Sequence, residues 1–412
     1  MSKQKNELFP ELRFPEFIHS RGWDAVYGNN AFEQISNKDH NSDLPILAIT
    51  QEYGAIPREM IDYNVSVTEK SVQSYKVVDV GDFIISLRSF QGGIEYSEYK
   101  GLCSPAYVIL RNKKGIDKRF FKQYFKAKSF IRDLTKNLEG LRDGKMISYK
   151  QFSGVLLPKP STEEQQKIAD CLASIDELIA LHTQKLEALK DYKKGLMQQV
   201  FPAEGETAPK LRFPEFQGEG EWVRKPLERI IEIASGQVDP TKPPYCDMPH
   251  IGGENIESDS GKILNVSTAK DLNLISGKYA FDESYILYSK IRPALNKVAS
   301  PNFKGICSAD IYPIRPATNE LLKGFLFYLL LSKEFLDYAK KHSDRGKIPK
   351  VNREALMAYI ASLPVPDEQR QIAEFLCSID DLLASQTRKV EALRAHKNGL
   401  MQKLFPVVDE VV

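Results

Sequence analysis

Two segments of the chain carry apolar residues at spacings that alternate between four and three. Eight of ten positions in each series are apolar, and polar residues interrupt both series at the same two places. A period of 3.5 residues sustained over five heptads predicts a coiled coil in each segment. The alternative is an amphipathic helix lying on its own globular domain. The predicted seam residues are Ile168, Leu172, Ile175, Ile179, Leu186, Leu189, Leu196 and Val200 in the first segment, and Ile372, Leu376, Ile379, Leu383, Val390, Leu393, Leu400 and Leu404 in the second.

The two segments are copies of each other. Residues 168–202 align without gaps on 372–406, with 20 of 35 positions identical at an offset of 204. Upstream, PELRFPEF recurs as PKLRFPEF, and each copy is followed by a tryptophan, Trp23 or Trp222. Arg88 and Arg292 also stand at the offset of 204. The pattern predicts a duplicated plan, in which each half is a variable globular segment followed by a nearly constant helix.

Connectivity fixes the direction of the two helices. Ser161 and Glu164 fit a capping box at the start of the first helix, and Pro202 marks its end. The first helix leads from the first globular segment to the second, and the second helix begins at the second segment. If their seams pair within the chain, the helices must be antiparallel. Gly195 and Gly399 interrupt the pattern, and they predict either the end of each helix or a close contact with a partner.

The variable segments combine short strands with one helix each. Runs rich in β-branched residues are separated by Gly, Pro and Asn turns, and helical stretches follow at 117–138 and 318–341 before a closing strand that ends in Leu-Pro. The sequence therefore predicts two copies of a mixed α/β (α+β) domain, joined by two long helices that form an antiparallel coiled coil. The expected domains are 1–160 (the first head), 161–202 (the central helix), 203–362 (the second head) and 363–412 (the second helix and tail). The expected strand runs are 65–72, 77–87, 104–111, 262–269 and 284–292.

Composition narrows the class of protein. The chain has 412 residues, 42% hydrophobic and 27% charged, and no apolar run approaches the ~18 residues that span a bilayer. Its five cysteines form no CxxC pair, and its N-terminus lacks the apolar stretch of a signal peptide. We therefore expect a cytoplasmic protein with no membrane segment.

Positive charge gathers in one stretch of each half. Residues 111–150 hold 13 basic and 4 acidic residues, and residues 315–354 hold 9 and 5. Such stretches favour contact with a polyanion at two places, although a solvated helix face is the alternative. In the first stretch, Phe121, Phe125 and Leu134 are expected to face a core while lysines face phosphates. Loops with Arg, Lys, Asn or Gln could read bases. The candidate DNA-binding residues are Gln51, Arg58, Arg88, Lys118, Lys122, Lys126, Lys145, Asn255, Lys290, Arg292 and Lys347.

A catalytic or metal site is not expected. TKPPYC resembles the proline-rich loop of amino-methyltransferases, but Lys242 has only donors where a hydrogen-bond acceptor would be needed. The six histidines show no metal-ligand spacing, and no glycine-rich phosphate loop is present. We therefore expect no catalytic residue, metal or cofactor in this chain.

The duplicated start of each long helix and the GLMQ…FP end of each resemble the specificity subunit of type I restriction–modification systems. The resemblance rests most specifically on Leu157-Pro158 with 165–169, and on Leu363-Pro364 with 368–373. It implies two target-recognition domains that each read half of a split DNA sequence, with the coiled coil setting the spacer. It also implies two methyltransferase subunits that use S-adenosylmethionine, and two motor-nuclease subunits that use ATP and Mg²⁺.

One departure and two alternatives accompany this interpretation. The first copy has two extra residues between Leu-Pro and Glu-Gln, which predicts a slight tilt of the first head on its helix. A non-catalytic coiled-coil adaptor would bind proteins through its heads. A stand-alone DNA-binding regulator would bind a specific sequence without partners.

Overall fold

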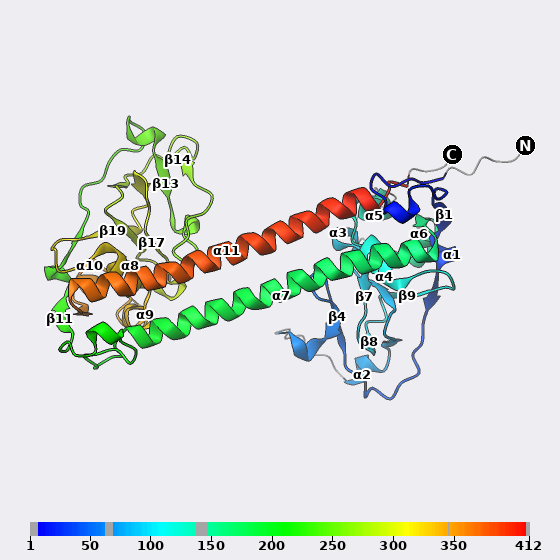
Figure 1. Cartoon of the computed structure of the whole chain (residues 1–412), viewed down its shortest axis with the longest axis horizontal. Coiled ribbons are helices and arrows are strands. Elements are labelled where there is room, and N and C mark those ends of the chain that lie inside the picture. The colour runs from blue at the N-terminus through cyan, green and yellow to red at the C-terminus, as the bar shows by residue number, and fades with distance from the viewer. Residues whose placement is uncertain (1–6, 62–68, 137–146, 345, 409–412) are drawn as a thin grey trace, which may run out of the picture. The chain divides into compact units, whose positions relative to one another are not determined.

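Two helices of 39 residues each run through the structure, α7 (Thr162–Val200) and α11 (Pro366–Leu404) (Figure 1). This computed structural model describes residues 7–61, 69–136, 147–344 and 346–408. Contacts divide the chain into a first unit, 1–183 with 388–412, and a second unit, 184–387. Each long helix therefore contributes one part to each unit. Among the described residues, none of the helices is long and apolar enough to cross a membrane.

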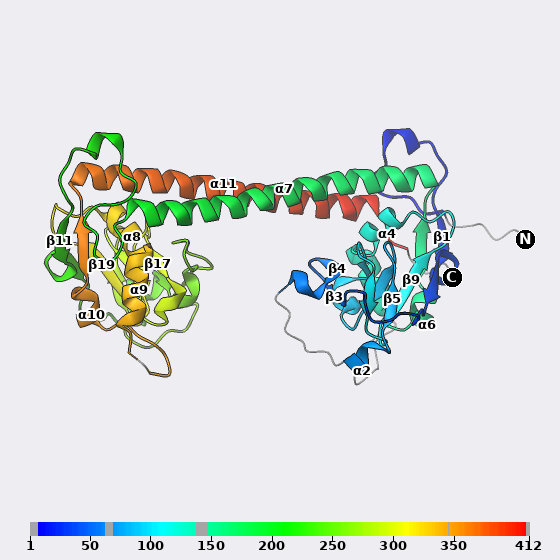
Figure 2. The same ribbon diagram turned by 90° about the horizontal axis from the view of Figure 1, so that it is seen from below.

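In the first unit, the start of α7 lies antiparallel to the end of α11 (Figures 1 and 2). Leu172 shares one hydrophobic core with Met401 and Phe405. One helical turn further along α7, the Asp176 carboxylate accepts from the Lys397 ammonium at 2.6 and 2.8 Å. Residue numbers rise along one helix as they fall along the other, so the predicted antiparallel pairing is confirmed in this unit.

The second unit repeats this arrangement with the helices exchanged. Leu196 and Val200, at the end of α7, share a core with Leu376, near the start of α11. The Lys193 ammonium lies 2.5 Å from a carboxylate oxygen of Asp380. The helices are antiparallel here as well, and both glycines of the repeat lie inside continuous helix. The expectation that a helix ends at Gly195 or Gly399 is therefore wrong.

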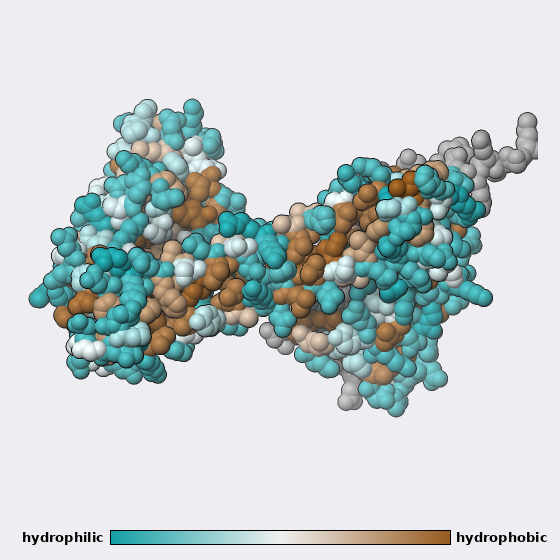
Figure 3. Space-filling model, viewed as in Figure 1, coloured by the Kyte–Doolittle hydropathy of each residue, from teal (hydrophilic) through white to brown (hydrophobic). Residues whose placement is uncertain are grey.

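Burial along the helices follows the 3.5-residue period. All the predicted seam residues are buried or half-buried, and their polar interruptions are too. Leu178, Leu181 and Leu382, which lie off the seam, are 45%, 54% and 57% exposed. In the space-filling view, apolar side chains gather beside the helices of the first unit (Figure 3). A narrow apolar stripe is thus covered while other leucines of the same helices face solvent.

The two heads share the order of their main sheet. In the first head the antiparallel sheet has the order β2-β9-β6-β7, and in the second it has the order β12-β19-β16-β17. A short antiparallel pair closes each head, β1 with β10 and β11 with β20. The second head adds a four-stranded sheet, β14-β13-β18-β15, where the first has two separate pairs, β3-β4 and β5-β8. The bounds in the first head are β1 Asp24–Tyr27, β2 Phe32–Ile35, β3 Leu47–Thr50, β4 Gly54–Pro57, β5 Lys76–Val78, β6 Phe83–Ile85, β7 Glu95–Tyr96, β8 Gly101–Cys103, β9 Val108–Asn112 and β10 Leu156–Lys159.

Strands of the second head and the short helices complete the framework. The strands are β11 Val223–Pro226, β12 Ile231–Ile233, β13 Pro249–Ile251, β14 Ser267–Thr268, β15 Tyr279–Phe281, β16 Ile286–Ser289, β17 Val298–Ala299, β18 Gly305–Cys307, β19 Ile311–Pro316 and β20 Ile360–Leu363. The short α-helices are α1 Gly28–Ala31, α2 Glu69–Val72, α3 Ser89–Gly92, α4 Lys118–Tyr124, α5 Lys128–Thr135, α6 Tyr149–Ser153, α8 Lys323–Leu331, α9 Lys333–Lys341 and α10 Arg353–Met357. The 3₁₀ helices are η1 Pro15–Phe17, η2 Arg58–Met60, η4 Pro214–Phe216, η5 Leu227–Arg229, η6 Tyr245–Asp247, η7 Gly253–Asn255 and η8 Pro293–Leu295.

Three local predictions were wrong. The single helices expected at 117–138 and 318–341 are helix pairs, α4 with α5 and α8 with α9. Ser332 has extended backbone and accepts from the Phe335 amide, so it caps a new helix rather than continuing the old one. The run 65–72, expected to be a strand, ends in helix α2, since Glu and Lys are poor strand formers; residues 62–68 lie outside the described part.

The duplicated start of each long helix fastens it to its own head. Arg13, from the LRFPEF segment, donates two hydrogen bonds to Glu164, and Arg212 does the same to Glu368. Both glutamate side chains are almost completely buried, 2% and 1% exposed. Ser161 accepts from the Glu164 amide, as the predicted capping box requires. The Glu164 side chain, however, holds Arg13, so the box is only half-formed.

The adjacent glutamines align the two copies. Gln165 donates to the Pro160 carbonyl at 3.0 Å, and Gln369 donates to the Pro364 carbonyl at 2.9 Å. Pro160 and Pro364 are therefore equivalent at the offset of 204, and no extra residues separate strand from helix in the first copy. The predicted tilt of the first head loses its basis, because the Leu-Pro at 157–158 lies inside the closing strand β10.

Candidate nucleic-acid interface

In the first head, two candidate residues from distant segments meet. Gln51 begins the turn between β3 and β4, and α3 begins directly after Arg88. The Gln51 amide donates to the Arg88 carbonyl at 3.2 Å, and both residues are exposed. Lys126 reaches the same loop, donating to the Gly92 carbonyl at 3.0 Å. The structure thus brings Gln51, Arg88 and Lys126 to one surface.

The lysines of the basic stretch 111–150 divide into two kinds. As expected, Phe121 and Phe125 are fully buried beneath them. Lys122 pairs with Glu98 at 2.6 Å, and Lys126 pairs with the buried Glu95 at 2.5 Å. Lys118 is exposed, and its side chain lies next to Gly81. Because two of these ammonium groups already neutralise carboxylates, this stretch offers less free positive charge than its sequence indicates.

Two further candidates of the first head are Arg58 and Lys145. Arg58 is half-buried at the start of η2, and its amide donates to the Ile46 carbonyl. Lys145 lies outside the described residues.

Asn255, a candidate of the second head, folds its own loop. Its side chain is 8% exposed, accepts from the Gly252 amide, and donates to the carbonyls of Leu264 and Asn265. Both ends of the amide are therefore used to close the turn around η7, which leaves it poorly placed to contact a base.

The preceding strand, β13, carries a buried histidine. His250 is 5% exposed, and neither ring nitrogen has a hydrogen-bond partner among the described residues. Burial lowers the pKa of His250, the positive charge of Lys278 lowers it further, and Glu254 acts in the opposite direction. The folded state therefore holds the neutral ring.

This histidine makes the second head sensitive to acid. Because its folded pKa lies below the unfolded value of about 6.5, the unfolded chain takes up the proton first as pH falls. Its contribution to stability is present above about pH 6.5 and is lost progressively below it. His250→Leu, which cannot ionise, should lose less stability than the wild type between about pH 6.5 and 5. Urea unfolding of both proteins across this range measures the difference, and identical pH profiles would contradict the assignment.

In the second head, three candidates converge on one surface. The segment 346–351 lies beside the loop after β16, because the Arg292 amide donates to the Pro349 carbonyl at 2.8 Å and the Val351 amide donates to the Lys290 carbonyl at 2.8 Å. Lys347 is exposed on that segment. Lys290, Arg292 and Lys347 therefore come from two loop segments that are joined by backbone hydrogen bonds.

Electrostatics at this surface favour an anion. The Lys290 ammonium lies over the Tyr312 ring, 5.0 Å from its centroid. Burial lowers the pKa of Lys290, and the neighbouring charge of Lys350 lowers it further. A phosphate bound between the ammonium groups of Lys290 and Lys350 would offset their mutual repulsion. Sequence reasoning missed Lys350, whose only signal was its place in the basic stretch 315–354.

Arg292 has unusual backbone geometry. Its φ and ψ are 49° and 59°, in the left-handed region, and Asn296 at the other end of η8 is also left-handed, at φ 44°. For a residue with a Cβ this conformation costs about 1–2 kcal/mol. Asn296 is held by hydrogen bonds from its side chain to Asp259 and to the Leu331 carbonyl. The surrounding fold therefore imposes this loop conformation.

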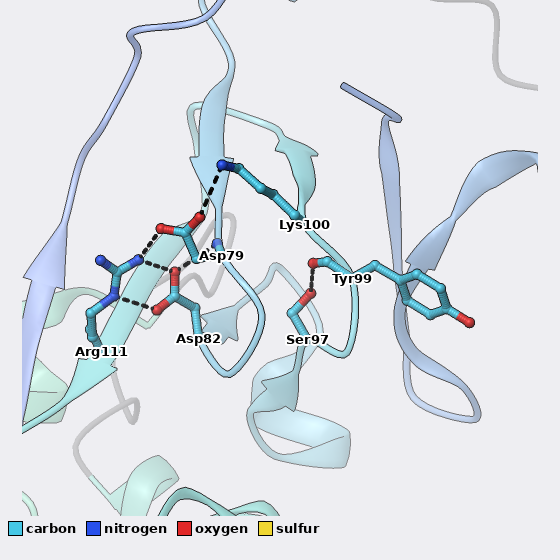
Figure 4. A network of polar contacts seen from close by, with 6 residues as sticks. All are labelled: Asp79, Asp82, Ser97, Tyr99, Lys100 and Arg111. Carbon is cyan, nitrogen blue, oxygen red and sulfur yellow. Dashed lines mark hydrogen bonds and ion pairs between the residues drawn. The ribbon is translucent and has the colours of Figure 1, made fainter. Parts of the chain in front are cut away.

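A polar network stabilises the sheet of the first head (Figure 4). Arg111, on β9, donates to Asp82 and Asp79 at 2.7 Å, and Asp82 also accepts from the Asp79 amide at 2.9 Å. The hydrogen bonds that Arg111 donates to the two aspartates, with Asp82 the larger cause, raise the pKa of Arg111. Lys100 lies 3.7 Å from Asp79 at the rim. Because each charge of this network is paired, its role is to fix the β5–β6 turn rather than to bind a ligand.

Sequence reasoning also missed two matching polar triads. In the first unit Gln123 and Lys397 both donate to Asp176, and in the second unit Tyr328 and Lys193 both donate to Asp380. The two polar seam residues Lys193 and Lys397 thus link the two long helices to each other, while Gln123 and Tyr328 link the same aspartates to the heads. Their signal in the sequence was that both interrupt the seam at equivalent places.

The described part of the chain carries exposed cations and two deeply buried thiols. No group of three or more His, Cys, Asp or Glu among them could hold a metal ion. Cys103 and Cys307 are buried, and burial raises the pKa of each thiol to about 12, which makes both poor nucleophiles. Exposed cations on ordered loops, one set in each head, suit a polyanion.

Comparison with known families agrees with this arrangement. The family model described as "Type I restriction modification DNA specificity domain" matches residues 27–191 and 219–394. The type I restriction enzyme EcoDI specificity subunit of Escherichia coli is 26% identical over 310 residues, covering 68% of this chain and 67% of its own. The MjaVIII specificity subunit of Methanocaldococcus jannaschii is 25% identical over 434 residues, covering 98% and 96%.

Solved structures share the fold. The S subunit of a type I restriction–modification system from M. genitalium superposes with a TM-score of 0.55 at 14% identity, over 98% of this chain and 100% of that one. A chain from a type I R-M system, solved to explain complex assembly and conformational transition, gives a TM-score of 0.55 at 17% identity, over 93% and 98%.

Proposed function

Because this chain belongs to the family of type I restriction–modification DNA specificity domains, we propose that it selects the DNA sequence on which a type I restriction–modification enzyme acts. Members of this family are non-catalytic DNA-recognition subunits with two target-recognition domains. The family match favours this function over that of a coiled-coil adaptor or a stand-alone regulator. Its proposed substrate, cellular double-stranded DNA, would place it in the cytoplasm.

Each head is proposed to read one half of a bipartite target. The observation that carries this is the duplicated plan with unlike surfaces: the main sheets have the same strand order, while the loops that carry Gln51 and Arg88 differ from those that carry Lys290 and Lys347. Two heads with the same framework and different recognition loops would recognise two different half-sites. The proposed domains are those expected from the sequence, with heads at 1–160 and 203–362.

The constant parts are proposed to bind two copies of one partner, the methyltransferase subunit. Both units present the same LRFPEF segment, fastened by the same arginine–glutamate pair to the same helix start. Two equal surfaces suit two identical partners. Those partners would supply S-adenosylmethionine chemistry, and two motor-nuclease subunits would supply ATP- and Mg²⁺-dependent restriction.

The glycines of the repeat test this partner surface. A Cβ built on Gly195 or Gly399 meets no atom within 4 Å, so nothing in the described chain requires glycine there. Gly399→Ala should stabilise the free chain by about 1 kcal/mol, because glycine is the poorer helix former. If a partner packs closely at this point, the same change should weaken co-purification with the methyltransferase subunit.

A matched control separates the two effects. Gly154 is exposed outside the repeated segments, and a Cβ there would meet only the Gln151 carbonyl oxygen at an ordinary 3.7 Å, so Gly154→Ala should leave assembly unchanged. Thermal unfolding measures stability, and quantitative pull-down measures assembly. A Gly399→Ala protein that gained stability and assembled normally would remove this glycine from the proposed interface.

Exchange of one head tests the proposed function directly. The chain is co-expressed with its methyltransferase subunit, and modified adenines are mapped across the genome. Replacing residues 20–155 with the corresponding domain of another specificity subunit should change one half of the methylated sequence and leave the other half intact. A change in both halves would contradict modular recognition, and a wild-type complex that methylates no defined sequence would reject the function itself.

A further inference from the structure

We propose that Arg88 and Arg292 are equivalent base-reading residues, each donating two hydrogen bonds to a guanine in the half-site of its own head. The inference rests on the proposed function and names the residue and the base through which each head would choose its sequence. It arises from three observations: equivalent positions in the two sheets, ordered loops, and guanidinium groups that the described chain leaves unused.

The two arginines hold the same place in the fold. In each head the third strand of the main sheet, β6 or β16, is followed by a loop, and the arginine stands three residues after the strand ends at Ile85 or Ser289. The spacing is retained although the loops differ, since α3 follows Arg88 and η8 follows Arg292. The shared offset in the sequence therefore reflects a shared position in space within each head.

The loop of the second head is fixed at both ends. The Arg292 amide donates to the Pro349 carbonyl, the Leu295 amide donates to the Arg292 carbonyl, and the Asn296 side chain is anchored to Asp259. Pro293 directly follows the left-handed Arg292. A conformation that is unfavourable for arginine persists only when neighbours enforce it, and such positions gather at functional sites.

The loop of the first head is fixed by side chains. Ser86 accepts from the Arg88 amide at 3.2 Å, and Ser89 accepts from the Ser86 amide at 2.9 Å. Gly93 at φ +81° completes the loop, where a Cβ would lie 2.0 Å from the Phe125 carbonyl oxygen. Ordering before binding lowers the entropy that recognition must lose.

Both guanidinium groups remain available. No hydrogen bond or ion pair involves the side chain of Arg88 or Arg292 within the described ranges, and both residues are exposed. Neighbouring cations are engaged differently: Lys126 pairs with Glu95, and Lys290 lies over Tyr312. An exposed apolar side chain stands beside each arginine, Leu87 at 54% and Leu295 at 41%, and could meet a thymine methyl.

Guanine is the base that such an arginine fits. Its O6 and N7 acceptors in the major groove match the parallel N–H donors of a guanidinium, and no other base offers this pair. A lysine ammonium is a point charge that suits a phosphate, whereas the planar guanidinium donates two parallel hydrogen bonds with the geometry of the guanine edge. We therefore assign Arg292 to the base and Lys347, exposed on the adjoining segment, to the backbone.

The test compares Arg292→Gln, Arg292→Lys and Lys347→Gln in the complex with the methyltransferase subunit, using adenine mapping. Arg292→Gln should reduce methylation at the wild-type sequence by about tenfold to a hundredfold and relax or change a single G·C position in one half-site. Arg88→Gln should do the same in the other half-site only. Lys347→Gln should weaken binding to all sequences alike and reduce the salt dependence.

The outcomes separate cleanly. Arg292→Lys keeps the charge, so correct assembly with a degraded motif supports base reading. An unchanged motif in Arg292→Gln, or a uniform loss over all sequences, would overturn the inference. A wild-type half-site with only A·T pairs would overturn it without any variant and leave the proposed function standing. Absence of any defined methylated sequence in the wild type would instead reject the proposed function.

Discussion

Replacing Glu368 with alanine is expected to lower the free energy of unfolding of the second unit by about 3 kcal/mol. The Glu368 carboxylate is 1% exposed and accepts two hydrogen bonds from Arg212 at 2.8 Å. Its removal would leave the guanidinium, 12% exposed, without its carboxylate in a place that water barely reaches. The arginine keeps two carbonyl partners, at Glu219 and Gly220, which holds the loss at the lower end of the range for a broken buried pair.

Two variants serve as controls for this experiment. Glu374→Ala removes an exposed carboxylate from the same helix and should change stability by less than about 0.5 kcal/mol. The double change Arg212→Met with Glu368→Leu should cost less than Glu368→Ala alone, because no charge is then left buried. Urea unfolding measures all three. Equal stabilities for Glu368→Ala and Glu374→Ala would show that the pair does not fasten helix to head.

Lengthening both helices by one heptad is expected to lengthen the spacer of the methylated sequence by up to about 3 bp. Seven residues add about 10 Å to a helix, and one base pair occupies about 3.4 Å of duplex. The insertion points follow from the division of the chain, after Thr183 in α7 and after Thr387 in α11. A heptad keeps the seam in register, because the seam repeats every 3.5 residues.

The matched control inserts the heptad into α7 alone. One lengthened helix cannot keep both the Asp176–Lys397 and the Lys193–Asp380 ion pairs, so methylation should fall sharply. Adenine mapping reports both results. A double insertion that methylates efficiently at the original spacer would show that the helices do not set the distance between half-sites.

Some features of the recognition surface were within reach of the sequence and others were not. The offset of 204 placed Arg88 and Arg292 at matching positions, and the sheets confirm this, because an alignment records duplication even where the loops have diverged. Lys122 and Lys126 looked alike as phosphate contacts, yet both are held by carboxylates from β7 and the residues after it. Such partners lie more than 20 residues away and leave no local pattern.

Asn255 is a second candidate whose role the sequence could not decide. Its position in a glycine-rich loop suggested a base contact. Its side-chain amide instead makes three hydrogen bonds to residues 3, 9 and 10 positions away, and these close the turn. Asparagine serves turns and base recognition with the same donor and acceptor atoms. Only the folded loop decides between these roles.

The sequence by itself determined the duplicated plan, the two long helices, their seam and their antiparallel direction. These features depend on periodicity and connectivity, which can be read from the spacing of residues along the chain. The tertiary structure alone decided that each basic stretch is a helix pair, that Glu164 and Glu368 hold arginines, and which cations stay free. Those outcomes depend on contacts between side chains that are far apart in the sequence. Their partners are determined by geometry and burial in the folded chain rather than by sequence spacing.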